Sequence, residues 1–251
     1  MPKLEAGGQV VEAAAVLFDK DCTLIDSAAI WPDLVERRVA RLGELLPLAP
    51  KLVPVIYRAI GLKLPERRPI PRSPLALGPR RDTIVAVATV LFLEGVDWDA
   101  ALEAVQRAFQ LADEETERAG GADAFPEARP LLAALRRAGF RIGVLTNDDR
   151  ERAAQTLARV GLGDLVEAVA GGDEVKSPKP DPAILQLLCR KLDLAPKDCV
   201  VVGDALSDIR MGLSAGVRLT VGVTTGSATR SEFDGLAGAV VSSLGEIRPL
   251  P

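Results

Sequence analysis

Three apolar runs of strand length in this sequence each end in a polar residue. The runs and the residues after them are 14–18 before Asp19, 141–145 before Thr146, and 199–202 before Gly203 and Asp204. Segments with a helical spacing of apolar residues separate the second run from the third and follow the third. This alternation is typical of an open parallel sheet with helices on both faces, in which ligands bind outside the carboxyl ends of the strands. We therefore expect the three polar ends to meet in one crevice.

The same alternation continues toward the C-terminus. Further strands are predicted at 165–170, 218–223 and 239–241, and helices at 126–138, 149–160, 182–192 and from Ser207. Gly139 and Gly161 follow two of these helices, where glycine commonly ends a helix. The residues before Ala14 are interpreted as a polar leader, and the last residues as a closing turn of helix.

The segment from residue 28 to about 120 lacks this alternation and is predicted to be helical. Helices are expected after Pro32 and at 51–60, 82–94 and 98–117. A long loop crowded with proline and arginine, 63–81, lies between the second and the third of them.

These patterns predict an α/β chain of two domains. Residues 1–27 and 121–251 would form a Rossmann-like core, an open parallel sheet with helices on both faces. Residues 28–120 would form an inserted, all-helical cap domain over the crevice.

Asp19 and Asp21 carry the first chemical information. Residues two apart on an extended segment point to the same side, about 7 Å apart at Cα, so the two carboxylates can face one small volume. Two carboxylates so close together repel each other, so the arrangement is stable only if a cation lies between them or if one carboxyl keeps its proton. With the hydroxyl of Thr23 nearby, this pattern favours a carboxylate nucleophile beside a second carboxylate.

An Asp-x-Asp stretch can also serve in two ways that involve no nucleophile. It can simply turn the chain, since aspartate is common at strand ends and helix N-caps. It can also open a calcium-binding EF-hand loop. That loop is excluded, because Leu24 occupies the sixth position, where glycine is needed, and Ile30 occupies the twelfth, where glutamate is needed.

Composition excludes several classes of function. The sequence has no histidine, which removes Ser-His-Asp hydrolases, Cys-His proteases and histidine-ligated zinc. Cys22, Cys189 and Cys199 have no C-x-x-C spacing and are expected to be free thiols in a reducing compartment.

The balance of charge and hydropathy points to a small-molecule partner. The net charge of −4 does not indicate the basic surface that nucleic-acid binding requires. The longest apolar run, residues 84–93, is about half of what a membrane span requires. Glu5 and Glu12 stand where a signal peptide needs an apolar core. We expect a cytoplasmic protein that binds neither nucleic acid nor membrane.

Four stretches resemble, in order, the motifs of the haloacid dehalogenase superfamily of phosphotransferases. They are Asp19-Lys20-Asp21-Cys22-Thr23, Thr146-Asn147, Lys179 in SPKPDP, and Gly203-Asp204 with Asp208. Each stands in the structural context that the family's motif needs, and the resemblance covers essentially the whole chain. Cys22 departs from the pattern, because the family usually has glycine there and a side chain narrows the choice of backbone conformations.

The resemblance implies a nucleophile, an acid and a metal ion. Asp19 would attack phosphorus and form an aspartyl phosphate, and Asp21 would protonate the leaving oxygen and then activate water. Mg²⁺ would be held by Asp19, the backbone carbonyl of Asp21 and Asp204, with Asp208 bound directly or through water. Asp208 could also simply lie in the first turn of its helix, where the macrodipole favours it.

The resemblance also implies ligands for the phosphoryl oxygens, namely Thr146, Asn147 and Lys179. Alternatives remain open for all three residues. Thr146 and Asn147 could cap the helix that starts near Asp149. Lys176 lies three residues from Lys179 and could reach the site in its place.

Asp21 narrows the function within the family, because a halide leaving group needs no proton whereas an ester oxygen does. Dehalogenases resemble this architecture but lack a carboxylate at that position. The placement of the cap is similar to that of phosphoglycolate phosphatases and β-phosphoglucomutases. We therefore expect a magnesium-dependent phosphomonoesterase acting on a small phosphorylated metabolite, with phosphoglycolate as the favoured substrate.

Three further possibilities stay open from the sequence. A sugar phosphomutase of the same superfamily is one alternative, and a non-catalytic domain that binds phosphorylated ligands is another. Arg80 and Arg81 stand just before the helix predicted from Asp82 and are candidates for recognising a second anionic group of the substrate, since a planar guanidinium binds a carboxylate in bidentate fashion.

Overall fold

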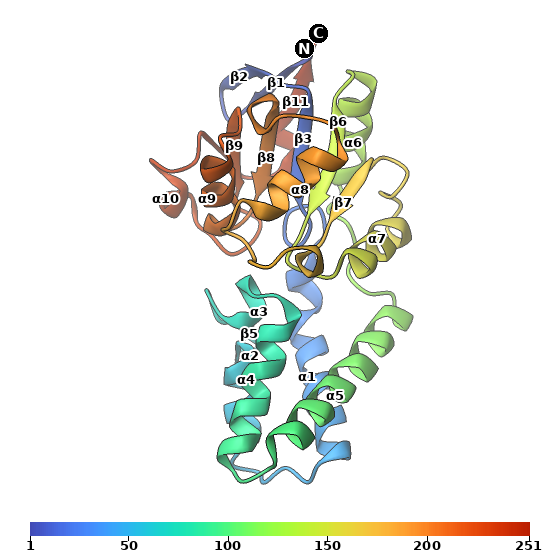
Figure 1. The fold of residues 1–251 in the computed structure, drawn as a ribbon, viewed down its shortest axis with the longest axis vertical. Helices are drawn as coiled ribbons and strands as arrows, with labels where there is room; N and C mark the ends of the chain where they lie inside the picture. The colour runs from blue at the N-terminus through green and yellow to red at the C-terminus, as the bar shows by residue number, and fades with distance from the viewer. The chain divides into compact units, whose positions relative to one another are not determined.

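The computed structural model describes all 251 residues, which divide into two compact units. Met1–Asp26 and Ala124–Pro251 form the first, which we call the sheet unit, and Ser27–Asp123 form the second, the helical unit (Figure 1). The sequence predicted domain boundaries after residues 27 and 120, close to the boundaries after Asp26 and Asp123 in the structure. The functional roles of core and cap stay predictions.

A six-stranded parallel sheet forms the centre of the sheet unit, in the order β10-β9-β8-β3-β6-β7 (Figure 1). Its strands are β3 (Ala15–Asp19), β6 (Arg141–Leu145), β7 (Ala168–Ala170), β8 (Cys199–Gly203), β9 (Leu219–Val223) and β10 (Ala239–Val241). Every residue of β3 and β8 is buried, as expected for central strands covered on both faces. The predicted α/β class is confirmed.

Helices alternate with these strands along the chain. They are α6 (Ala128–Arg137), α7 (Arg150–Arg159), α8 (Ala183–Lys191), α9 (Leu206–Ala215) and the short α10 (Arg230–Phe233), with 3₁₀ turns η1 (Gly172–Glu174), η2 (Pro196–Asp198) and η3 (Leu244–Glu246). On one face of the sheet, Leu188 of α8 and Met211 of α9 pack with Leu17 and Val201. Because β3 lies between β8 and β6, the carboxyl ends that carry Asp19, Thr146 and Asp204 are neighbours.

The two ends of the chain form a second, antiparallel sheet of three strands, which the local sequence patterns did not predict. Its strands are β1 (Lys3–Ala6), β2 (Gln9–Glu12) and β11 (Ile247–Leu250), in the order β11-β1-β2. The interpretation of the first residues as a polar leader was wrong. The expected closing turn of helix is present as η3, but the strand β11 follows it. Leu4 and Ala6 alternate with polar residues and are fully buried, and β1 finds its partner β11 at the opposite end of the chain.

The helical unit contains five helices and one small ribbon. The helices are α1 (Ser27–Leu45), α2 (Val53–Ile60), α3 (Pro74–Leu77), α4 (Arg80–Leu93) and α5 (Trp98–Arg118), and the ribbon pairs β4 (Leu62–Lys63) with β5 (Arg68–Pro69). Its own apolar core includes Leu42, Ile56, Val87 and Phe109 from four of the helices. No helix of either unit is both long and apolar enough to cross a membrane.

Two details of the helical unit differ from the prediction. Pro32 lies inside α1, which begins five residues earlier at Ser27. Pro32 lies beyond the first turn, so its missing N–H costs the helix the hydrogen bond to the carbonyl of Ala28. The segment predicted as a loop, 63–81, contains most of the two-stranded ribbon and α3, so the unit is helical in its core but not throughout.

Candidate active site

The chain turns sharply after Asp19, the last residue of β3. The carbonyl of Lys20 accepts hydrogen bonds from the backbone N–H groups of Leu24 and Ile25, both at 3.0 Å. Cys22 in this turn has a φ of 58°, in the left-handed region that favours glycine. The turn therefore uses a conformation that glycine adopts most readily, although a cysteine stands there.

Asp19, Asp204 and Asp208 place their carboxylates together, and we call them the carboxylate cluster. One oxygen from each lies within 4.8 Å of the others, and all three residues are buried. Asp19 ends β3, Asp204 directly follows β8, and Asp208 lies in the first turn of α9. Oδ2 of Asp208 also accepts a hydrogen bond from the N–H of Ala205 at 3.1 Å, so this residue caps its helix as well as joining the cluster.

Lys179 brings a positive charge into the carboxylate cluster. Its Nζ lies 2.5 Å from Oδ1 of Asp19 and 2.8 Å from Oδ1 of Asp208. The loop that carries it is anchored, because the backbone N–H of Lys179 donates to Oδ1 of Asn147 at 3.1 Å. Lys176 is exposed, so Lys179 is the lysine that reaches the cluster.

Burial and mutual repulsion dominate the electrostatics of the cluster. Burial raises the pKa of Asp19 well above its usual range; Lys179 lowers it, and the charges of Asp208, Asp204 and Asp21 raise it further. Burial, together with Asp208, likewise raises the pKa of Asp204 to about 6. For Lys179, burial alone would lower the pKa, but Asp19 and Asp208 outweigh that effect and raise it. The lysine therefore stays protonated among carboxylates that repel one another.

The donor set of the carboxylate cluster suits a hard divalent cation. Its three buried carboxylates carry more negative charge than the single ammonium of Lys179 balances. Mg²⁺ prefers carboxylate oxygens and keeps several water ligands, so it needs only a few protein groups. The residues present therefore fit a magnesium ion held by Asp19, Asp204 and Asp208.

The loop after β9 supports Asp204, a contact that the local sequence patterns did not reveal. The backbone N–H of Ser227 donates to Oδ2 of Asp204 at 2.8 Å. A Cβ on Gly226 would lie 2.0 Å from the same oxygen and 2.6 Å from Cβ of Cys22, so only glycine lets the loop pass this close. A glycine after a strand can signal such a close approach as well as a turn.

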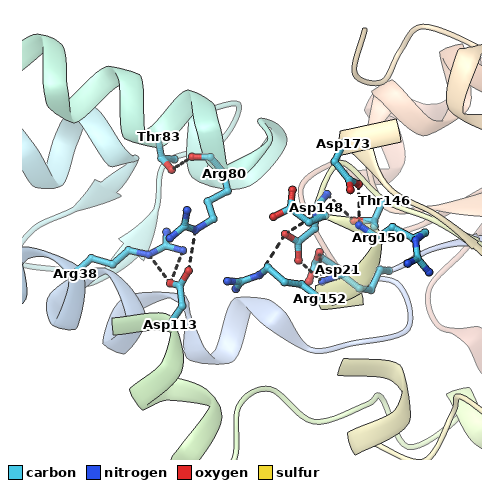
Figure 2. Close-up of polar contacts among 12 residues, drawn as sticks. Asp21, Arg38, Arg80, Thr83, Asp113, Thr146, Asp148, Arg150, Arg152 and Asp173 are labelled. Carbon is cyan, nitrogen blue, oxygen red and sulfur yellow. Dashed lines mark hydrogen bonds and ion pairs between the residues drawn. The ribbon is translucent and has the colours of Figure 1, made fainter. Parts of the chain in front are cut away.

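Thr146 directly follows β6 and is buried. Its Oγ1 accepts a hydrogen bond from the N–H of Asp148 at 3.1 Å (Figure 2). A hydroxyl that accepts one bond can still donate its proton to another group. Because α7 begins at Arg150, with Asp149 in the N-cap position, Thr146 does not cap that helix.

Asp21 forms an ion pair with the residue before it. Nζ of Lys20 lies 3.2 Å from Oδ2 of Asp21 and donates to Oδ2 of Asp148 at 3.0 Å. Burial would lower the pKa of Lys20, but the two carboxylates outweigh it and raise that pKa. Burial would raise the pKa of Asp148, and the charge of Lys20 brings it below its ordinary value. Neither Lys20 nor Asp148 was assigned a role from the sequence.

The helical unit holds the two arginines predicted to set specificity, in different environments. Arg80 shares Asp113 with Arg38 (Figure 2): Nε of Arg80 lies 2.8 Å from Oδ2 of Asp113, and Nη2 of Arg38 lies 2.8 Å from Oδ1. The guanidinium of Arg38 also lies over the ring of Phe109, 4.5 Å from its centroid. Arg81, by contrast, has an exposed side chain. A role in specificity stays a prediction for both.

The sequence of both units matches a known family. A family model described as haloacid dehalogenase-like hydrolase matches residues 13–216. The chain belongs to this family. This match confirms two predictions from the sequence, that the chain belongs to this family and that it is a hydrolase.

Two relatives agree with this assignment, and a solved structure shares the fold. A phosphoglycolate phosphatase from Cupriavidus necator is 34% identical over 209 residues, covering 81% of this chain and 78% of that protein. An N-acetylmuramic acid 6-phosphate phosphatase from Pseudomonas putida is 30% identical over 206 residues, covering 81% and 80%. A crystal structure of a predicted phosphoglycolate phosphatase from Haemophilus somnus shares the fold, with a TM-score of 0.71 and 22% identity over 93% of this chain and 95% of that one.

Proposed function

We propose that this hydrolase is a magnesium-dependent phosphomonoesterase that cleaves a small phosphate ester, with phosphoglycolate favoured, through an aspartyl phosphate on Asp19. The observation that carries the proposal is the position of Asp19 at the end of β3, inside a buried cluster with Asp204, Asp208 and Lys179. A phosphatase is also what the family and the similar proteins support.

Asp19 would be the nucleophile. A carboxylate oxygen of Asp19 would form a bond to phosphorus while the bond from phosphorus to the ester oxygen breaks. The ammonium of Lys179, bound to Asp19, would stabilise the negative charge on the phosphoryl oxygens as the phosphoryl group passes to the carboxylate. The bound Mg²⁺ would supply further neutralisation of phosphoryl charge.

Asp21 would act as the acid and then as the base. It would give a proton to the departing ester oxygen and later take one from the water that hydrolyses the aspartyl phosphate. Its side chain is 35% exposed, so it remains open to solvent and substrate, whereas Asp19 is buried. This division between a buried nucleophile and a more accessible acid fits the two roles.

Thr146 and Lys179 would bind the phosphoryl group. Thr146 would donate its hydroxyl proton to a phosphoryl oxygen, and Lys179 would offer an N–H that it does not use on the carboxylates. The side-chain oxygen of Asn147 already accepts the N–H of Lys179, so Asn147 would position the lysine-bearing loop. Direct contact of Asn147 with phosphate stays a prediction.

A phosphate-release screen tests the proposal. The purified protein would be given phosphoglycolate, N-acetylmuramic acid 6-phosphate, sugar phosphates, nucleotides and p-nitrophenyl phosphate, with Mg²⁺ and with EDTA. We expect release that requires Mg²⁺ and is lost in Asp19→Asn, which keeps the shape of the side chain but cannot form the acyl phosphate. Release by Asp19→Asn near the wild-type rate would contradict the covalent mechanism.

The same screen separates the alternatives. A sugar phosphomutase would isomerise a sugar phosphate without net release of phosphate, and a binding domain would bind the esters without converting them. A cytoplasmic location stays an expectation.

A further inference from the structure

Lys20 stands between the two aspartates of the first motif, yet the proposed chemistry gives it no role. Its side chain is only 5% exposed. A buried ammonium is tolerated where it is paired and hydrogen-bonded, and Lys20 is paired twice, with Asp21 and with Asp148. The residue therefore bridges the loop after β3 to the loop after β6.

Several hydrogen bonds hold the Asp148 end of this bridge. The backbone N–H of Asp148 donates to Oγ1 of Thr146 at 3.1 Å, and its carbonyl accepts the N–H of Gly172 at 2.8 Å. Oδ1 of its carboxylate accepts the N–H of Asp149 at 2.9 Å. The other carboxylate oxygen, Oδ2, is the one that binds Lys20.

The backbone of Lys20 is also held, because its carbonyl closes the turn through Leu24 and Ile25. The most exposed member of the bridge is the side chain of Asp21, at 35%, whereas those of Lys20 and Asp148 are 5% and 21% exposed. An ammonium fixed at 3.2 Å from one oxygen of Asp21 limits the rotation of that carboxyl.

We infer that Lys20, held by Asp148, is a positioning residue that orients the carboxyl of Asp21 for proton transfer to the leaving oxygen. The inference rests on the proposed function, because the acid role of Asp21 is part of that proposal. A general acid must lie within hydrogen-bonding distance of the oxygen that it protonates, so its orientation matters only where a proton is needed. Loss of Lys20 should therefore harm poor leaving groups more than good ones.

The test compares kcat/KM for two esters. One is p-nitrophenyl phosphate, whose leaving group departs without a proton, and the other is phosphoglycolate or the best alkyl phosphate of the screen. This constant covers the steps up to departure of the leaving group, so it isolates the step in which Asp21 is the acid. Lys20→Met and Asp148→Asn should each lower the alkyl-to-aryl ratio by about tenfold, part of the roughly hundredfold or larger contribution of general acid catalysis.

A double-mutant cycle shows whether Lys20 acts through Asp21. In an Asp21→Asn background the acid is gone, so adding Lys20→Met should leave the ratio unchanged. The matched control is Lys191→Met, which removes another lysine–carboxylate pair of the sheet unit, the one with Glu174 at 2.7 Å. Lys191→Met should leave the ratio at the wild-type value.

Several outcomes would overturn the inference. An equal loss on both esters in Lys20→Met, or a further fall of the ratio in the Asp21→Asn background, would mean that Lys20 does not act through Asp21. If Lys20→Met does not fold, an unchanged ratio in Asp148→Asn decides against the bridge. An active wild type with these results leaves the proposed function standing, whereas a wild type that releases phosphate from neither ester overturns both.

Discussion

Lys179 places its ammonium nitrogen 2.5 Å from Oδ1 of Asp19, although 160 residues separate the two in the chain. The contact joins the proposed nucleophile at the end of β3 to the loop before α8. It supplies positive charge to the buried carboxylate cluster.

Replacing Lys179 should remove this charge without removing the nucleophile. Lys179→Met is expected to lower kcat/KM by roughly 10²–10³-fold, the scale seen when one preorganised donor to a transition-state oxyanion is deleted. Lys176→Met is the matched control, because Lys176 is exposed, and it should keep wild-type kinetics. Steady-state phosphate release measures both variants, and equal kinetics in the two would exclude a role for Lys179.

Stability without metal should fall as pH rises through the range in which Asp204 titrates. The folded-state pKa of Asp204 is raised from 3.8 to about 6, so the folded protein binds more protons than the unfolded chain between these values. The stabilisation that comes from protonated Asp204 is therefore present at low pH and is lost as the pH rises through about 6. At 1.36 kcal/mol per pKa unit, the free energy of unfolding should fall by on the order of 3 kcal/mol.

Urea unfolding in EDTA, at about pH 4.5 and about pH 7.5, checks this prediction. Asp204→Asn lacks the titrating group, so it should be more stable than wild type at the higher pH. At the lower pH the two proteins should have more similar free energies of unfolding. Added Mg²⁺ should stabilise wild type most at the higher pH, where the carboxylates are ionised. The opposite pH trend in the difference between the two proteins would show that burial does not raise the pKa of Asp204.

Gly226 should be intolerant of a side chain. A Cβ there would lie 2.0 Å from Oδ2 of Asp204, so Gly226→Ala must move that carboxylate or the loop. Disturbing a residue that supports a metal ligand is expected to weaken Mg²⁺ affinity by roughly 10–100-fold. Gly245→Ala is the control, because a Cβ at Gly245 would meet its nearest neighbour at 3.4 Å. Calorimetric titration with Mg²⁺ compares the two, and equal affinities would argue against the site.

Arg80 and Arg81 should differ in their effect on a substrate that carries a carboxylate. Arg80 is held against Asp113, and a guanidinium fixed in this way can recognise a carboxylate with little loss of entropy, whereas Arg81 is exposed. Arg80→Ala is expected to raise KM for phosphoglycolate several-fold and to leave the hydrolysis of p-nitrophenyl phosphate almost unchanged. Arg81→Ala serves as the comparison, and wild-type kinetics in both variants would remove these arginines from specificity.

Much of the sheet unit could be predicted from local patterns. A fully buried strand is a short apolar run, and the polar residue that ends it marks the carboxyl edge of a parallel sheet. The runs before Asp19, Thr146 and Asp204 therefore indicated both the sheet and the place of its site, and the order of the motifs indicated the family. The spacing of Asp19 and Asp21 allowed reactive carboxylates but also a simple turn of the chain, and the other motifs favoured the reactive site.

Other features were decided only by the tertiary structure, because they depend on contacts between residues far apart in the chain. The partner of Lys20 lies 128 residues away in Asp148, and the sequence does not show which carboxylate a buried lysine will meet. Gly226 is indistinguishable from a turn glycine until its loop is seen against Asp204. The pairing of β1 with β11 joins the two ends of the chain, and such pairing follows from register and packing rather than from local propensity.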